Sequence, residues 1–314
     1  MSHSEQAHTE PVTPHSGQAP SKKHARPTPE SPRKQRRDAG ALLFTDRDAF
    51  ALNWIGQQYG IRLDQLQRLL GRSAGRGATS PISEGAARDV VTRWKRGQWV
   101  RVARIRAHEP FWIWPTRLGL RKVGLTYQYR DLEQSSLDDL KHLYAINEVR
   151  LAQGNETTKW KWISERQLLQ GVVRDKGKPL LHRPDAEIQA ADGDIIAIEV
   201  ELSLKKPLEL AENLMELLRG QEYLRLKIES GVPAARDKSW GEQSHYTQIW
   251  YFAPPAVRQQ VRKARARLIQ QGDISAQEAE RLFVRGYPPA KTEAEVQRDE
   301  QEDDESLDLD LPQT

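Results

Sequence analysis

The sequence of 314 residues contains no cysteine. This absence excludes disulfides, thiolate zinc sites and cysteine nucleophiles. The chain also lacks any run of about 18 apolar residues, the length that a membrane span needs. Its first residues, MSHSEQAHTEPVTPHSG, have no apolar core of a secretory signal peptide. We therefore expect a cytoplasmic protein, with a length that suits about two domains.

Charge is distributed unevenly along the chain. Residues 41 to 130 hold 16 Lys and Arg against 6 Asp and Glu, whereas residues 291 to 314 hold 2 against 10. A compact basic region is typical of proteins that bind polyanions, above all nucleic acid, although charge that serves only solubility gives the same count.

Both ends of the chain have the composition of disordered tails. Residues 1 to 40 are basic and polar with almost no large apolar side chain, so they have too little surface to bury. The segment from 273 to 314 ends in the acidic stretch RDEQEDDESLDLDLPQT. We interpret this stretch as a solvated tail; the alternative is a DNA-mimicking segment that competes for the basic region.

The basic region has the pattern of three helices followed by two strands. Thr45 and Asp48 resemble a capping box, LDQLQRLLG predicts a second helix that ends at Gly71, and Ser83 precedes a third helix, EGAARDVVTRWKRG. QWVRVARI and FWIWP then predict a hairpin, closed by a helical turn in TRLGLRKVG. This order is typical of a winged-helix domain over residues 41 to 130, which places its third helix in the major groove.

The third helix has an apolar stripe and a basic face. Helical spacing places Ala87, Val90, Val91 and Trp94 on the stripe. The residues that we expect to contact double-stranded DNA are Arg88, Thr92, Arg93, Lys95, Arg96 and Arg101. An ordinary small α+β domain with an Arg-rich helix is the alternative, because Arg is a good helix former.

Residues 131 to 272 mix helices and strands in a pattern that predicts an α/β domain. The first helix is SSLDDLKHLYAINEVRLAQG, capped by Ser136, and the strand TKWKWISE follows, with Ser164 before a short helix. Two strands then lie on either side of Ala191-Asp192-Gly193. The remaining elements are the long helix PLELAENLMELLRGQEYLRLK, the strand YTQIWYFA and the helix PAVRQQVRKARARLIQQ.

Two carboxylates interrupt the apolar strand IIAIEVEL. Strand alternation places Ala197, Glu199 and Glu201 on one face, opposite the large apolar residues. If Ala191-Asp192-Gly193 forms a three-residue loop, Asp185 lies directly opposite Glu199, and a divalent cation such as Mg²⁺ or Mn²⁺ offsets their repulsion.

Two alternatives explain this pattern without a metal site. A two-residue loop on Asp192-Gly193 places Asp185 opposite Val200 instead of Glu199. A hairpin whose outer face lies in water carries glutamates without any function, as antiparallel sheets commonly do.

Pro184-Asp185, Glu199-x-Glu201 and Lys205, between an upstream and a downstream helix, resemble the PD-(D/E)xK nuclease core, a restriction-endonuclease-like fold. That superfamily usually has a Lys two residues after the Glu, where Glu201 stands here. With the segments HLYAINEVR, KWISE, RPDAEI and IEVELS, residues 45 to 265 are more narrowly similar to the plasmid replication-relaxation family, which includes MOBC-class conjugative relaxases.

The resemblance implies a relaxase-type endonuclease that nicks double-stranded DNA near a replication or transfer origin, together with other mobilisation or replication proteins. It implies that Asp185 and Glu199 bind the metal, that Glu201 is a third ligand or a base, and that Lys205 stabilises the charge of the phosphorane. Glu148 stands where some relatives place another acid.

Two other functions fit the same pattern. The first is a non-catalytic DNA-binding regulator of replication or transcription with a nuclease-like scaffold, and the second is a structural partner protein that acts through its acidic tail. A Lys205 amine between Asp185 and Glu199 favours catalysis, whereas an amine in solvent favours binding alone. We interpret His142 as a core histidine and assign His182 to the hairpin.

Overall fold

The computed structural model describes residues 42–73, 80–154, 159–173, 182–220 and 246–289. These residues form a mixed α/β protein with a three-stranded and a five-stranded sheet. No helix within them is long and apolar enough to cross a membrane. The predicted N-terminal tail and the acidic stretch RDEQEDDESLDLDLPQT lie outside the described residues, as does the predicted extension of the long helix beyond Gly220.

The first and third helices begin at the predicted caps. α1 (Asp46–Gln57) has a complete capping box, in which the side chains of Thr45 and Asp48 each accept a hydrogen bond from the other's backbone N–H. α3 (Glu84–Arg96) begins after Ser83, whose hydroxyl accepts from a backbone N–H of the first turn. The predicted stripe of α3 is buried, as expected: Ala87, Val90, Val91 and Trp94.

The second helix ends later than predicted. α2 (Leu63–Ser73) continues past Gly71, where the sequence predicted its end. Gly71 is buried, and a Cβ at this position would lie 2.4 Å from the Ser80 carbonyl oxygen. The glycine thus permits a close approach of two backbone segments rather than ending the helix, and the predicted end was wrong.

A three-stranded sheet completes the N-terminal region. β2 (Val100–Ala103) and β3 (Trp112–Pro115) form the predicted hairpin, and α4 (Arg117–Lys122) follows it. β1 (Ile61–Arg62), which the sequence pattern missed, pairs antiparallel with β3. The sheet shares a buried core with α1, α2 and α3 that includes Trp94.

α5 (Leu137–Gln153) takes part in the cores of both sheets. It follows a 3₁₀ turn, η1 (Leu132–Gln134), and begins at a capping box formed by Ser136 and Asp139. Its N-terminal half packs with tryptophans of β3, and its C-terminal half packs on the five-stranded sheet.

The five-stranded sheet has the order β4-β5-β6-β7-β8. β4 (Trp160–Ser164), β5 (Ala186–Ala190) and β6 (Ile195–Val200) are antiparallel neighbours, and α6 (Glu165–Val173) follows β4. β7 (Gln248–Ala253) and β8 (Leu282–Gly286) add in parallel. β8 lies beyond residue 272, so the predicted domain range leaves out one strand of the sheet.

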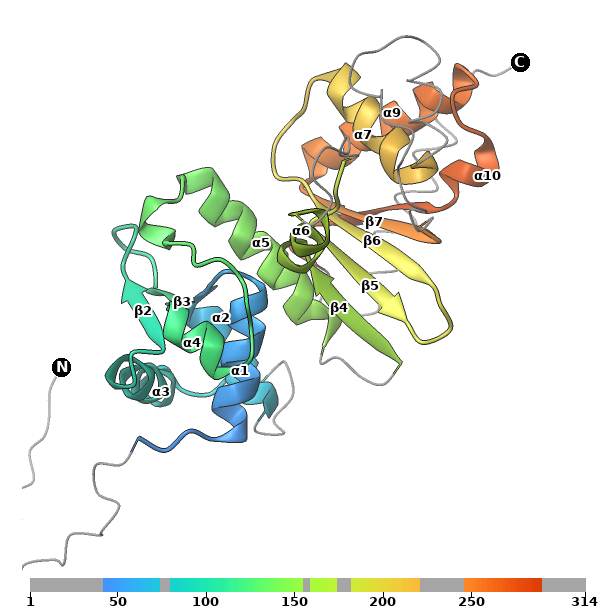
Figure 1. The fold of residues 1–314 in the computed structure, drawn as a ribbon. Helices are drawn as coiled ribbons and strands as arrows, with labels where there is room; N and C mark the ends of the chain where they lie inside the picture. The colour runs from blue at the N-terminus through green and yellow to red at the C-terminus, as the bar shows by residue number, and fades with distance from the viewer. Residues whose placement is uncertain (1–41, 74–79, 155–158, 174–181, 221–245, 290–314) are drawn as a thin grey trace, which may run out of the picture. The chain divides into compact units, whose positions relative to one another are not determined.

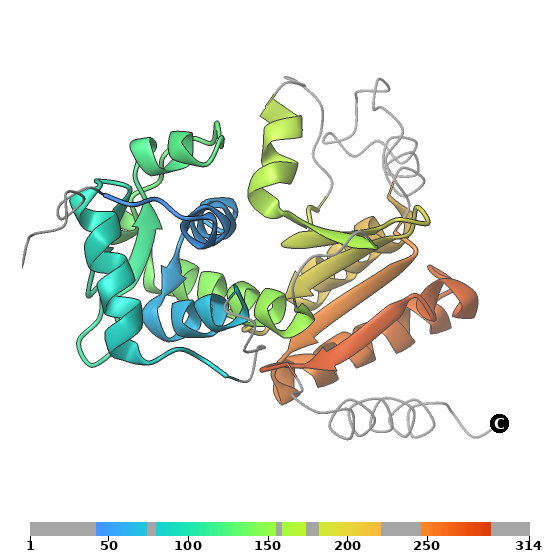
Figure 2. The ribbon, with the colours of Figure 1, turned by 90° about the horizontal axis from the view of Figure 1, so that it is seen from below.

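Helices cover both faces of this sheet (Figure 1). α5 packs on one face, and α7 (Pro207–Arg219), α9 (Pro255–Gln270) and α10 (Ala276–Ala279) pack on the other. Figure 2 gives a second view of these layers. Neighbouring residues of β6 therefore enter different cores: Ala197 packs with α7 and α9, and Ile198 packs with α5. A strand covered on both faces has no outer face in water.

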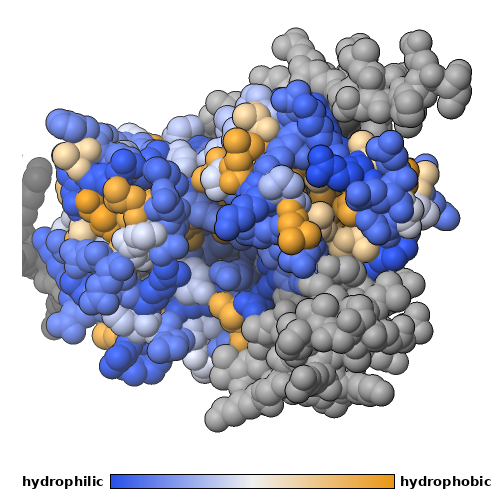
Figure 3. All heavy atoms as spheres, turned by 90° about the horizontal axis from the view of Figure 1, so that it is seen from above, coloured by the Kyte–Doolittle hydropathy of each residue, from blue (hydrophilic) through white to orange (hydrophobic). Residues whose placement is uncertain are grey.

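Hydrophilic side chains prevail on the face of the molecule that Figure 3 shows, where apolar side chains form small separate groups. Among the large apolar side chains, Leu43, Leu204 and Leu208 are the most exposed of the described residues.

Candidate functional site

The hairpin of β5 and β6 has the predicted three-residue loop. Ala190 N–H donates to the Asp194 carbonyl oxygen at 2.8 Å, and Gly193 has a φ of +99°, the left-handed region that favours glycine. The pairing of Ala186 with Ile198 continues this register, which aligns Asp185 with Glu199. The three-residue loop is therefore confirmed, and the alternative register opposite Val200 is wrong.

Asp185 is held at the start of β5 by two contacts. The N–H of Val200 donates to Oδ2 at 2.8 Å, and Nε2 of His142, on α5, lies 2.9 Å from Oδ1. Burial raises the pKa of Asp185 well above its usual range, and the charge of Glu199 raises it further, against the Val200 hydrogen bond. The position thus disfavours a second negative charge.

Glu199 is buried and only partly satisfied. Its side chain is 7% exposed, and Oε1 lies 2.8 Å from Nε2 of His182. Oε2 is buried with no hydrogen-bond partner among the described residues. Burial lowers the pKa of His182, but the charge of Glu199 and its hydrogen bond outweigh burial, so the net shift is upward.

Tyr251 places a second unpartnered polar atom beside the acidic pair. This residue of β7 is aligned with Glu199 in the parallel register. Its hydroxyl is buried without a partner in the described part of the chain. Burial and the charges of Glu199 and Glu201 raise the pKa of Tyr251, so the phenol stays protonated. Sequence reasoning missed this residue, because a Tyr in an apolar strand resembles a core residue.

Lys205 is paired with Glu201. Its Nζ lies 2.7 Å from Glu201 Oε2 and 3.7 Å from Glu209 Oε1. The side-chain amide of Gln260, on α9, bonds both the backbone N–H and the carbonyl of Lys205. Burial lowers the pKa of Lys205, but the hydrogen bond and charge of Glu201 raise it more. The amine is thus largely buried and paired with Glu201, and the structure shows no ion pair of Lys205 with Asp185 or Glu199 among the described residues.

Two histidines contact the acidic pair, and sequence reasoning assigned both to the structure. The interpretation of His142 as a core residue was wrong, since its side chain is 42% exposed and touches Asp185. His182, which lies three residues before Asp185 in the sequence, contacts Glu199. That proximity to the Pro-Asp motif was the available signal for His182. His142 had none, because the fold alone brings α5 to β5.

Glu148 forms its hydrogen bonds with α2. Arg68 Nη1 donates to its Oε2 at 2.9 Å, and Gln65 Nε2 donates to its Oε1 at 2.8 Å. Both donors belong to α2. These bonds make Glu148 a link between α2 and α5.

The predicted DNA-contacting residues fall into two groups. Arg88, Thr92, Lys95 and Arg96 are exposed on α3, where Arg88 also pairs with Glu84. Arg93 instead donates to the buried carboxylate of Asp48, and Arg101 pairs with Asp131 and Glu133. The last two arginines already have acidic partners within the chain.

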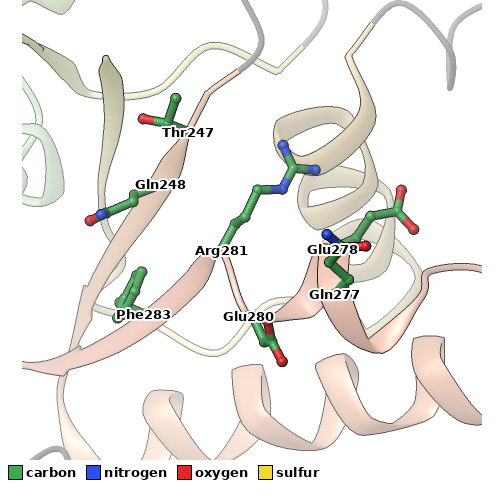
Figure 4. Close-up of a pocket in the computed structure, with 7 residues that line it drawn as sticks. All are labelled: Thr247, Gln248, Gln277, Glu278, Glu280, Arg281 and Phe283. Atoms are coloured by element: carbon green, nitrogen blue, oxygen red, sulfur yellow. The ribbon is translucent and has the colours of Figure 1, made fainter. Parts of the chain in front are cut away.

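Two cavities of the structure differ in the residues that line them. The larger, of about 420 Å³, lies beside β7, β8 and α10, and Figure 4 shows its lining residues. Two of its charged side chains have partners outside the lining: Glu278 pairs with Arg219, and Arg281 donates to the Tyr246 carbonyl at 3.0 Å. The smaller cavity, of about 200 Å³, opens on Asp185 and His142.

The donor set suits an ion that uses few protein ligands. Across the described ranges, no three His, Asp or Glu side chains converge into a ready-made metal site. Mg²⁺ ordinarily takes one or two carboxylates and completes its shell with water and substrate phosphate oxygens. Asp185 and Glu199 supply two carboxylates, and the unpartnered Oε2 of Glu199 fits a cation ligand.

Comparison with known proteins gives little beyond this geometry. Searches of protein families and of curated proteins find no match. Among solved structures, restriction endonuclease FokI bound to DNA aligns at 12% identity and a TM-score of 0.23, over 77% of this chain and 42% of that chain. A second FokI structure aligns at 10% identity, over 75% and 45%. The chain spans less than half of FokI, and a likeness this weak supports no functional conclusion.

Proposed function

We propose that this protein binds duplex DNA and nicks it as a metal-dependent endonuclease. The observation that carries the proposal is the alignment of Asp185 with Glu199 in a buried site, where one Glu199 oxygen has no donor among the described residues. Buried carboxylate oxygens are normally hydrogen-bonded, so Oε2 of Glu199 indicates a missing positive partner.

The order of elements supports the proposal. Helix α5, the antiparallel strands β4 to β6, helix α7 and the parallel strand β7 follow the order of a PD-(D/E)xK nuclease-like core, with the acids at the same end of β5 and β6. Helices α1 to α3 and the hairpin of β2 and β3 follow the order of a winged helix.

The site residues receive distinct roles in this proposal. A divalent cation held there would polarise the phosphate and lower the pKa of the attacking water. Asp185, oriented by the Val200 N–H, and Glu199, oriented by His182, would hold it. Glu201 positions Lys205, whose charge stabilises the phosphate as negative charge develops.

The exposed face of α3 docks on the DNA in the same proposal. Lys95 and Arg96 are exposed on this face, and Thr92 lies beside them. Basic side chains there neutralise phosphates, which fixes the register of the helix in the groove. The resemblance of the sequence motifs to the replication-relaxation family extends the proposal to a relaxase that acts at an origin with other mobilisation proteins.

A nicking assay tests the proposal. Supercoiled plasmid carrying a candidate origin is incubated with Mg²⁺ or Mn²⁺, and open-circular product is measured for the wild type, Asp185→Ala and Glu199→Ala. We expect nicking by the wild type and its loss in both variants. Glu187→Gln, a buried acid of β5 outside the pair, is the matched control and keeps activity. If the protein cleaves its cognate DNA with none of the divalent metals, the proposal is wrong.

A second function is favoured by one observation. Glu201 stands where the nuclease motif has its Lys, and Lys205 is bound to that same Glu201. A nuclease-like scaffold that only binds DNA accounts for this substitution. In that case Lys95→Gln and Arg96→Gln weaken binding, whereas Asp185→Ala and Glu199→Ala change stability alone.

A further inference from the structure

The cavity of about 200 Å³ is lined mostly by residues outside the Pro-Asp and Glu-x-Glu motifs. It is lined by residues of α1, the segment before α5, α5 itself and α6, among them Tyr59, Arg130, Ser135, Asp139, Glu165 and Asp185. Pockets for whole drug-sized ligands usually measure about 300 to 1,000 Å³. This cavity therefore suits a single ring system rather than a complete nucleotide cofactor.

Tyr59 occupies a backbone position that favours glycine. It follows the C-cap of α1 and has a φ of +71°. Glycine is the usual residue there, because a Cβ is disfavoured in the left-handed region. The chain has its glycine one position later, at Gly60, where a Cβ would lie 2.4 Å from Leu132 Cδ1. A tyrosine kept at a strained position indicates that its side chain has a role.

Two guanidinium groups lie against the Tyr59 ring. Arg166 lies 4.6 Å from the ring centroid and is anchored by a 2.6 Å hydrogen bond to the Gly56 carbonyl. Arg130 lies 5.2 Å from the centroid, and its 43% exposed side chain bonds Asp139. An exposed ion pair of this kind contributes little to stability, so Arg130 is easily displaced, whereas Arg166 is fixed.

Ser135 adds an unsatisfied hydroxyl to the same cavity. Its Oγ is buried and has no hydrogen-bond partner in the part of the chain that the structure describes. A buried hydroxyl without a partner is costly, which indicates that a ligand or water atom bonds it.

We propose that this cavity is a nucleobase subsite, in which a base of the DNA strand next to the attacked phosphate stacks on Tyr59 and bonds Ser135. The proposal rests on the proposed function. Stacking on an aromatic ring accepts any base, since every base has a π-face. The carboxylates of Asp139, Glu165 and Asp185 offset the charges of Arg130 and Arg166, which line the same cavity. The cavity therefore has no excess of positive charge to hold a phosphate, and the neutral part of the nucleotide enters.

The test measures binding and cleavage separately. Binding is followed in EDTA by the fluorescence of a mixed-sequence DNA duplex that carries 2-aminopurine at several positions. Cleavage of supercoiled plasmid then gives KM and kcat. We expect Tyr59→Leu to reduce the fluorescence change and to raise KM about tenfold with little change in kcat. Tyr59→Phe, which keeps the ring, behaves like the wild type, and Ser135→Ala has a smaller effect of the same kind.

Tyr127→Leu is the matched control, because Tyr127 also contacts Arg166 but does not line the cavity. Should Tyr59→Leu fail to fold, Ser135→Leu fills the cavity from its half-buried rim and is expected to raise KM similarly. Wild-type KM and fluorescence in both leucine variants would mean a cavity that holds only water, and would overturn the subsite. A fluorescence change that depends on Tyr59 in a protein that never nicks DNA would retain the subsite and reject the endonuclease.

Discussion

Two buried aspartates of this protein have opposite surroundings. Asp48 in α1 is 0% exposed and accepts hydrogen bonds from the Thr45 N–H at 2.9 Å and from Trp94 Nε1 at 2.8 Å, and it pairs with Arg93. Burial raises the pKa of Asp48, but these donors outweigh burial, and the net pKa is lowered. Asp185 faces Glu199 instead, and its pKa is raised.

The difference separates a structural carboxylate from a candidate functional one. The donors around Asp48 offset the cost of burying its charge, so the site is complete as it stands. Glu199 Oε2 has no hydrogen-bond partner in the described part of the chain, and in the proposed function a cation completes the pair. Burial alone therefore does not mark a functional acid; the balance of donors and charges around it does.

Asp48→Asn is expected to have the largest effect on stability of the substitutions considered. The substitution removes the charge that Arg93 pairs with, and we expect the free energy of unfolding to fall by about 3 kcal/mol in urea denaturation. Asp46→Asn, an exposed acid of the same helical turn, is the control and costs less than about 1 kcal/mol. Equal losses in the two variants would contradict a structural role of Asp48.

Residues on α3 extend the comparison to DNA binding. The double variant Lys95→Gln and Arg96→Gln is expected to lower duplex affinity about tenfold and to reduce the salt dependence by about two counterions. Lys141→Gln, an exposed lysine of α5 paired with Asp138, is the control and leaves both quantities unchanged. The measurement is fluorescence anisotropy across a salt series. An unchanged salt slope in the double variant would place the DNA on another surface.

The sequence predicted most elements because their signals are local. The capping box at Thr45, the stripe of α3 and the hairpin loop at Gly193 each depend on neighbouring residues, and all were confirmed. β1 and β8 were missed because short strands without clear alternation depend on their partners in the sheet.

The candidate site was predictable only in part. Alternation and loop length aligned Asp185 with Glu199, since hairpin register follows from local geometry. The contact of His142 with Asp185 and the alignment of Tyr251 with Glu199 could not be predicted, because both depend on packing between distant segments. Glu148 shows the converse: its place in a motif did not reveal its contact with α2.

Asp185→Asn tests whether Asp185, unlike Asp48, destabilises the folded protein when it is charged. A carboxyl whose pKa is raised on folding binds its proton more tightly in the folded state, so the free energy of unfolding falls as pH rises from 3.8 through the raised pKa. In EDTA above that pKa, the neutral variant is expected to be more stable than the wild type by about 1 kcal/mol. The measurement is urea denaturation at several pH values.

The control for this variant is Glu187→Gln on the same strand. The Tyr246 hydroxyl donates to Glu187 Oε1 at 3.0 Å, and the side-chain amide of Gln189 donates to Oε2 at 3.2 Å. A glutamine has only one acceptor oxygen for these two donors, so the substitution is expected to destabilise the protein. A loss of stability in Asp185→Asn as large as that in Glu187→Gln would mean that both acids are structural.

Glu278 is expected to have the smallest effect on the free energy of unfolding, with a pH dependence opposite in sign to that of Asp185. A hydrogen bond from Arg219 lowers its pKa to about 2, so its contribution to stability is present above 4.5 and is lost as pH falls toward 2. We expect Glu278→Gln to flatten the acid side of the stability curve by about 1 kcal/mol at most, because the pair is partly screened by solvent. The exposed Glu280→Gln is the control and leaves that side unchanged. Acidification thus removes a stabilising charge at Glu278 and relieves a destabilising one at Asp185, and only the latter response is expected to disappear when a divalent cation is added.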